Sequence, residues 1–260
     1  MSIQFDNIGS DQLYANVSSH GVTTGASSIG SWIKLPSSIA GTSFNDIQAL
    51  ATENLNPVSY WGTSVDQTAG QWEMFANGTS INGGTPATST WYYIVFSRTG
   101  TTTKMRVFND STSTTPLTSI TDTWSNNIST FDILSLSFQT TGETGIDLTI
   151  CTKFYGGAEW TDAECRTESQ KRTMQKVGGS PSWVWRNEDI TSTTEGLLEL
   201  GGSGKDMTNS GAVTSATRPT QLEAAGGGGG GVTVMIPPIL IINSGVSPIT
   251  IGSGLQNIIL

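Results

Sequence analysis

Three carboxylates lie close together in the stretch EWTDAE, residues 159–164, and paired carboxylates can hydrolyse glycosidic bonds. In retaining glycosidases the two carboxyl groups are about 5–5.5 Å apart, which on a strand requires them to share one face. Glu159, Asp162 and Glu164 are spaced i, i+3 and i+5, so they cannot all share one face of a regular strand. Two of them also fall in the first turn of a predicted helix, where the helix dipole favours negative charge. We therefore predict helix capping here, no catalytic residue and no enzyme activity.

The other candidates for catalysis or phosphate binding have incomplete motifs. His20 is the single histidine, lies in the loop-forming stretch SSHGVTTG without an identifiable partner, and is accompanied by no Gly-x-Ser-x-Gly elbow. The stretch GGSGK resembles a P-loop, but Glu199 stands where the first glycine is required and Asp206 replaces the Ser or Thr. Both stretches are predicted to be ordinary loops or turns.

The two cysteines, Cys151 and Cys165, have no cysteine or histidine at ligand spacing, which excludes a zinc site. The N-terminal stretch MSIQFDNIGSDQLY has neither a positive start nor an apolar segment, so it is not a conventional signal peptide. We expect the protein to be made and kept in a cytosol until a later release. Both thiols are then expected to be reduced.

Aromatic side chains leave two interpretations open. Tyr60, Trp61 and Trp72 fall in sequence rich in loop-forming residues, and they are the candidate glycan-binding residues. Eight tryptophans are more than a core requires, yet most tryptophans of a β-sandwich still belong to its core.

The composition favours strands and argues against nucleic acid as a partner. Charged residues make up 13% of the chain, against about 25% in ordinary globular domains. Such a composition suits short strands and turns better than helices, whose surfaces are usually rich in Glu and Lys. The net charge is −9 and no basic cluster occurs, whereas nucleic-acid binding relies on clustered Lys and Arg.

Several segments alternate with period two, as strands do. In FDILSLSF, Leu134, Leu136 and Phe138 share one face, while Ser135 and Ser137 share the other. The run WYYIVF is apolar on both faces, as in a strand covered on both sides. Many short strands at this spacing predict an all-β protein, an antiparallel β-sandwich. The predicted strands cover residues 27–35, 45–50, 91–96, 102–108, 131–138 and 145–151.

One segment, residues 161–176, is predicted to be a helix on the surface of the sandwich. Thr161 is its N-cap, and Glu164 three residues later completes a capping box. Trp160 can pack against Cys165 as a hydrophobic staple. The glycine pair at residues 178–179 is expected to end the helix.

The order of these segments resembles a known family. The run from Trp91 through residues 161–164 (TDAE) is similar to the second half of a LamG-like, concanavalin A-like lectin/glucanase jelly roll. Residues 31–34 (SWIK) resemble its early strand, and residues 183–219 resemble a closing segment of such domains in phage structural proteins. The resemblance covers residues 1–222.

This resemblance implies a jelly-roll fold and raises the question of calcium. LamG-like domains often hold a calcium ion at the sandwich rim, and Asp6, Asp11 and Asp206 could supply oxygen ligands. None of them lies in an EF-hand pattern, and solvated turns are the favoured interpretation. No cofactor is predicted, and the metal question stays open.

The C-terminal part has a different composition. Six glycines at residues 226–231 form a predicted hinge within residues 223–231, and an apolar segment at 232–260 follows. Its run of eleven residues, broken by two prolines, is shorter than the roughly 17 that a membrane span requires. We predict an assembly arm that adds strands to the edge of a partner sheet. The predicted docking residues are Val232, Val234, Ile236, Ile239, Ile241, Ile249, Ile251, Ile258 and Leu260.

Together these features predict a non-enzymatic structural protein of a phage virion. The lectin-like sandwich would decorate a capsid, neck or tail, with the arm docked on other virion proteins and with homo-oligomers expected. The alternative is a glycan-binding adhesin module of a receptor-binding fibre, with cell-surface glycans as partners. A glycoside hydrolase or lyase is the third and least favoured interpretation.

Overall fold

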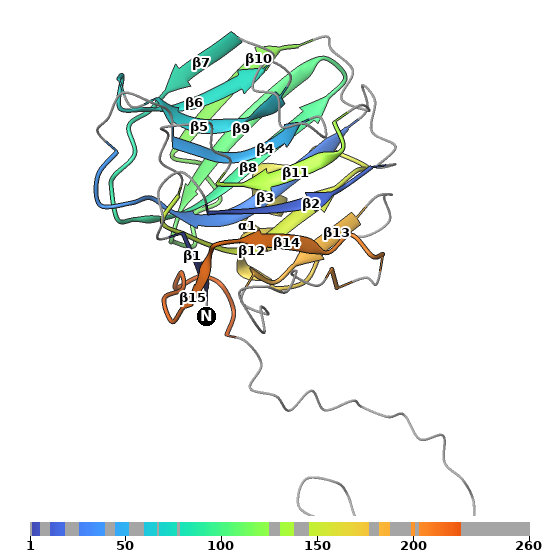
Figure 1. Cartoon of the computed structure of the whole chain (residues 1–260). Helices are drawn as coiled ribbons and strands as arrows, with labels where there is room; N and C mark the ends of the chain where they lie inside the picture. The colour runs from blue at the N-terminus through green and yellow to red at the C-terminus, as the bar shows by residue number, and fades with distance from the viewer. Residues whose placement is uncertain are drawn as a thin grey trace, which may run out of the picture. The chain divides into compact units, whose positions relative to one another are not determined.

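The fold is described from a computed structural model of the chain (Figure 1). The structure describes residues 2–5, 11–18, 26–39, 45–51, 60–66, 68–76, 79–124, 131–137, 146–176, 182–187, 199–200 and 203–224.

Two antiparallel sheets pack face to face, and this arrangement confirms the predicted β-sandwich of jelly-roll type. Sheet A has the strand order β10-β9-β8-β3-β12-β1-β15, and β13 pairs with β12 beside this path. Its strands are β1 (Ser2–Gln4), β3 (Ser27–Lys34), β8 (Trp91–Thr99), β9 (Thr102–Asn109), β10 (Thr118–Thr123), β12 (Leu148–Tyr155), β13 (Ser182–Trp185) and β15 (Val213–Ser215).

Sheet B has the order β14-β2-β11-β4-β5-β6-β7 and lies in front of sheet A in Figure 1. Its strands are β2 (Gln12–Asn16), β4 (Asn45–Ala51), β5 (Tyr60–Asp66), β6 (Gln71–Ala76), β7 (Thr79–Gly83), β11 (Ile133–Leu136) and β14 (Met207–Ser210). All six strands predicted from period-two or apolar runs are present. The pattern could predict them because each has at least one buried face.

The main core lies between the two sheets. Leu134 and Leu136 of β11 are fully buried there, as their alternation with serines predicts. Trp72 of β6 packs edge-on against Tyr92 of β8, with ring centroids 4.9 Å apart. Because these rings come from opposite sheets, their contact is one of those that join the two layers.

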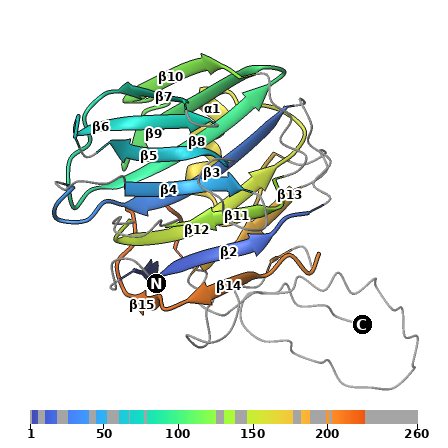
Figure 2. The same ribbon diagram turned by 45° about the horizontal axis from the view of Figure 1, so that its top comes forward.

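A second apolar layer covers the outer surface of sheet A. The helix α1 (Asp162–Gln170) lies there, behind the two sheets in Figure 2. Cys165 of the helix and Trp160 before it are fully buried with Trp32 and Tyr93 of the sheet. The run WYYIVF is therefore apolar on both faces because β8 is covered by sheet B on one side and by the helix layer on the other.

The start of α1 agrees with the sequence prediction, but its end does not. The Thr161 hydroxyl accepts a hydrogen bond from the Glu164 backbone N–H, and the Glu164 carboxylate accepts one from the Thr161 N–H. The predicted continuation to residue 176 is wrong, because the helix ends at Gln170. The buried carboxylate of Glu168 turns the chain back instead, by accepting hydrogen bonds from backbone N–H groups that follow the helix.

The last described residues form a clasp, residues 218–223, on the helix side of sheet A. The Asp110 carboxylate accepts hydrogen bonds from the backbone N–H groups of Thr220 and Gln221 at 2.6 and 2.7 Å. Leu222 is fully buried in the layer beneath the helix. The clasp therefore combines an apolar anchor with charge-assisted hydrogen bonds.

The clasp closes at Glu223, whose carboxylate accepts a hydrogen bond from the Arg172 backbone N–H at 2.8 Å. This bond lowers the pKa of the Glu223 carboxyl.

The chain divides into two units after Glu223, Met1–Glu223 and Ala224–Leu260. The predicted hinge and all nine predicted docking residues lie outside the described residues. No helix in the described part of the chain is long and apolar enough to cross a membrane.

Candidate functional site

The carboxylates of EWTDAE fix the start of α1 to strand β9. Arg106 of β9 is almost fully buried, and its guanidinium lies 3.0 Å from an Asp162 oxygen and 3.4 Å from a Glu159 oxygen. Lys104 adds a second ion pair to Glu159 at 2.7 Å. Glu164 serves the capping box, as predicted. Each of the three carboxylates therefore has a contact that holds the helix in place.

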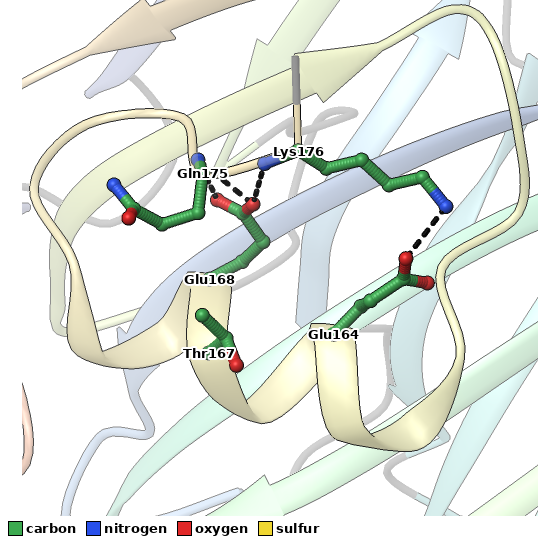
Figure 3. A pocket seen from close by; sticks show the side chains of 5 residues that line it. All are labelled: Glu164, Thr167, Glu168, Gln175 and Lys176. Atoms are coloured by element: carbon green, nitrogen blue, oxygen red, sulfur yellow. Dashed lines mark hydrogen bonds and ion pairs between the residues drawn. The ribbon is translucent and has the colours of Figure 1, made fainter.

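A cavity of about 360 Å³ lies between α1 and the segment that follows it (Figure 3). Glu168 at its base accepts hydrogen bonds from the backbone N–H groups of Gln175 and Lys176 at 2.9 and 2.6 Å. Its other oxygen accepts a hydrogen bond from the Lys153 ammonium at 2.7 Å, and both side chains are buried. The lining residues are Glu164, Thr167, Glu168, Gln175 and Lys176.

The charged groups of this cavity bind one another. The Lys176 ammonium lies 2.7 Å from the Glu164 carboxylate, as the dashed line in Figure 3 shows. Lys153 also donates to the carbonyl oxygens of Glu168 and Thr173 at 2.8 Å each. Because an ammonium has three protons to donate, Lys153 is fully satisfied by the protein. The cavity is therefore better explained as a by-product of the chain reversal after α1 than as a ligand site.

The structure does not support two of the three predicted glycan-binding residues. Trp61 and Trp72 are 0% and 1% exposed, and both belong to the core between the sheets. They lie within strands β5 and β6 rather than in loops, and their positions along these strands point inward. The prediction failed because the surrounding glycines and threonines hide the period-two pattern. The side chain of Tyr60 lies outside the described residues.

An accessible polar surface lies instead on the outer side of sheet B, along the adjacent strands β2 and β14. Tyr14 of β2 lies directly opposite Thr208 of β14 in the register. The intervening residues Leu13 and Met207 are fully buried in the core. We call this surface the β2–β14 face, and it consists of the outward side chains of Gln12, Tyr14, Asn16, Thr208 and Ser210.

The five side chains of the β2–β14 face have neutral polar chemistry around one aromatic ring. Asn16, Thr208 and Ser210 are exposed, while Gln12 and Tyr14 are partly exposed. The Asn16 side-chain oxygen accepts a hydrogen bond from the Ser18 backbone N–H at 2.9 Å, which leaves its amide NH₂ as a donor. A partly exposed ring flanked by hydroxyl and amide groups can stack on a ligand and hydrogen-bond its edges.

The sheet itself limits this face on two sides. On β11, Ser135 lies opposite Tyr14 and is fully buried, so the accessible surface ends there. At its other border, β14 is followed by Gly211. The backbone there has a φ of +86°, which suits glycine, and Asp11 occupies the space that a side chain would need. The alternation in QLYAN is the sequence signal of this face, because it places Gln12, Tyr14 and Asn16 on one side of β2.

Acidic side chains occupy the distant part of the same outer surface. Glu73 of β6 is 3% exposed, and burial raises the pKa of its carboxyl although the Ser64 hydroxyl donates to it. Asp66 of β5 has a lowered pKa, chiefly because its carboxylate accepts a hydrogen bond from the Ala69 backbone N–H. The outer surface of sheet B is therefore neutral at β2 and β14 and acidic toward β5 and β6.

The residues considered for metal binding do not come together in the described part of the chain. The Asp206 carboxylate accepts a hydrogen bond from the Glu199 backbone N–H at 2.8 Å, Asp11 is buried, and Asp6 lies outside the described residues. Within the described ranges, no three His, Cys, Asp or Glu side chains lie close enough together to hold a metal ion. His20 also lies outside the described residues.

Both cysteines are free and buried in the layer between sheet A and α1. Burial raises the pKa of the Cys151 thiol, and it raises the pKa of the Cys165 thiol to about 12. Neither is exposed, as an activated nucleophilic cysteine is. Their arrangement is that of small apolar core residues.

No protein-family model matches this sequence, and no curated protein matches it. Among solved structures, a putative carbohydrate binding protein from Bacteroides ovatus is similar, with a TM-score of 0.49 and 12% identity over 84% of this chain. The match covers 61% of that protein. A heptameric SAP-like pentraxin from Limulus polyphemus has a TM-score of 0.47 and 14% identity, over 80% of this chain and 94% of its own. A Trypanosoma rangeli sialidase has a TM-score of 0.41 and 13% identity, over 55% of this chain and 22% of its own.

Proposed function

We propose that this chain is a glycan-binding module and that the β2–β14 face is its binding site. The observation that carries the proposal is the partly exposed ring of Tyr14 among four neutral hydrogen-bonding side chains. The outer surface of sheet A offers no equivalent among the described residues near α1, because the helix covers Trp32 and Tyr93 there. The glycan-binding alternative drawn from the sequence is therefore kept, with its site moved from β5 and β6 to β2 and β14.

The chemistry of the face suits a saccharide. A sugar ring presents an apolar C–H surface that can lie on an aromatic ring, and hydroxyl groups around its rim. The Tyr14 ring supplies the apolar platform, while the hydroxyls of Thr208 and Ser210 and the amides of Gln12 and Asn16 can donate and accept hydrogen bonds. Because all five lie on two paired strands, the backbone ladder holds their spacing.

The test is saccharide binding by variants of this face. We expect the protein to bind one or more oligosaccharides of a glycan array, and Tyr14→Ala to weaken that binding by about tenfold or more, which corresponds to about 1.4 kcal/mol or more. Thr208→Ala is expected to weaken it less. Thr121→Ala, on the exposed surface of edge strand β10 in the other sheet, is the matched control. Isothermal titration calorimetry measures the affinities. An affinity of Tyr14→Ala equal to that of the unchanged protein would contradict the proposal.

We propose further that the module is displayed on a phage particle, with residues 232–260 as its docking arm. The support is in the sequence, where six glycines separate the clasped sandwich from an apolar segment too short to span a bilayer. The test is mass spectrometry of purified particles, in which the protein is expected at a fixed stoichiometry. Its absence from washed particles would remove the virion role and leave the glycan-binding role to stand alone.

A further inference from the structure

Resting on the proposed glycan-binding function, we infer that the β2–β14 face binds uncharged saccharides and discriminates against acidic ones. Its five outward side chains carry no charge. Recognition of a carboxylate or sulfate group commonly uses Arg or Lys, whose N–H groups form short, charge-assisted hydrogen bonds. The described part of this face offers only hydroxyl and amide groups for that purpose.

Lys205, the described cation that lies next to β14 in the chain, is already engaged by the protein. It lies two residues before β14, and its ammonium donates to the Ser18 carbonyl at 2.9 Å and lies 5.9 Å from the ring centroid of Trp183. An acidic saccharide on the β2–β14 face would therefore have to compete with these contacts for the Lys205 ammonium.

Carboxylates on the same outer surface act in the same direction. Asp206 directly precedes β14 and is exposed, and Asp66 lies further along the outer surface of sheet B. The whole chain carries a net charge of −9. Like charges repel most where salt screening is weak, so an acidic saccharide is disfavoured on approach as well as at contact.

The experiment compares matched neutral and acidic probes on the full-length protein. The neutral probes are lactose and the pentasaccharides of cellulose, xylan, chitin and mannan. The acidic probes are 3′-sialyllactose and pentagalacturonate. We expect binding to at least one neutral probe, a dissociation constant that changes less than twofold between 50 and 500 mM NaCl, and at least tenfold weaker binding of acidic probes. Acidic probes that bind more tightly, with affinity falling steeply as salt rises, would overturn the inference.

The outcomes separate this inference from the proposed function. If an acidic probe binds more tightly than every neutral probe and Tyr14→Ala abolishes that binding, the glycan-binding role stands and the neutral preference is wrong. If neither class of probe binds, both the proposed function and the inference that rests on it are wrong.

A charge variant locates the selectivity on the face. Thr208→Lys places an ammonium beside Tyr14, and it is expected to raise affinity for pentagalacturonate by about tenfold relative to Thr121→Lys, the matched control on β10. Both positions are exposed, and circular dichroism checks that both proteins are folded. Equal affinities of the two lysine variants for pentagalacturonate would overturn the assignment of the selectivity to this face.

Discussion

Lys153 carries its charge into the layer between sheet A and α1, where its side chain is fully buried. Its ammonium is held by the Glu168 carboxylate and by two carbonyl oxygens. Glu168 in turn binds the backbone after the helix, so a single ion pair determines both where the helix ends and how the chain reverses. Removing one partner of such a buried ion pair destabilises the protein, because the remaining charge stays buried without its partner.

We predict that Lys153→Met destabilises the protein by about 3–5 kcal/mol, because it leaves the Glu168 carboxylate buried without its cation. The control is Lys176→Met, which removes the ion pair of Lys176 with Glu164. That pair is about a third exposed, so its loss is expected to cost about 1 kcal/mol or less. Urea unfolding of the three proteins measures the difference. Equal losses in the two variants would show that burial does not set the value of the Lys153 pair.

At the residue scale, the sequence identified types of side chain more reliably than their exposure. It correctly predicted Thr161 and Glu164, because a capping box depends on neighbours three residues apart. It misplaced Trp61 and Trp72, because whether a ring faces the core depends on the parity of its position within a strand. The same rule, applied to QLYAN, would have placed Tyr14 outward.

Among the elements, α1 depends on its first turn for local stability. We predict that Thr161→Ala destabilises the protein by about 1 kcal/mol, because the Glu164 backbone N–H loses its acceptor at the helix start. Thr167→Ala, in the exposed middle of the same helix, is expected to be neutral or slightly stabilising, because alanine is the better helix former. Thermal unfolding of both variants tests this pair. A larger loss in Thr167→Ala would contradict the assigned role of the cap.

Strands with a period-two or two-sided apolar pattern could be predicted from the sequence, while β5, β6, the helix length and the strand pairing could not. The six predicted strands owe their patterns to burial of one or both faces, which is local information. The end of α1 depends on Lys153, a residue of β12 that lies 15 positions before Glu168 in the chain. The central place of β3 in sheet A depends on pairing with β8 and β12, both distant in sequence. Such long-range partners leave no periodic signal.

For the whole molecule, the clasp at residues 218–223 defines where the sandwich ends. Arg172 follows α1 and binds Glu223 through both its backbone N–H and its guanidinium. Leu222 fills the layer below the helix. The resemblance to LamG-like domains, together with the glycine run that follows, predicted a boundary at residue 222. The structure gives this boundary a physical cause, since the last anchored side chain is followed by residues that belong to the second unit.

We predict that a chain ending at Glu223 keeps the thermal midpoint of the full-length protein, while a chain ending at Thr217 melts at least about 5 °C lower. The shorter chain loses the burial of Leu222, about 1.5–3 kcal/mol, and several hydrogen bonds at about 1 kcal/mol each. For a domain of this size, each kcal/mol lowers the midpoint by about 2–4 °C. Differential scanning calorimetry measures all three proteins.

The chain ending at Glu223 also tests the docking arm, because it retains the clasp and the β2–β14 face while removing residues 224–260. We expect it to bind saccharides with unchanged affinity and to sediment as a monomer, whereas the full-length chain associates through its apolar segment. If the truncated protein unfolds early, residues 224–260 contribute to the sandwich and the arm proposal is wrong. If it associates as the full-length chain does, assembly resides in the sandwich itself, and β14, the last described strand of sheet B, becomes the surface to mutate.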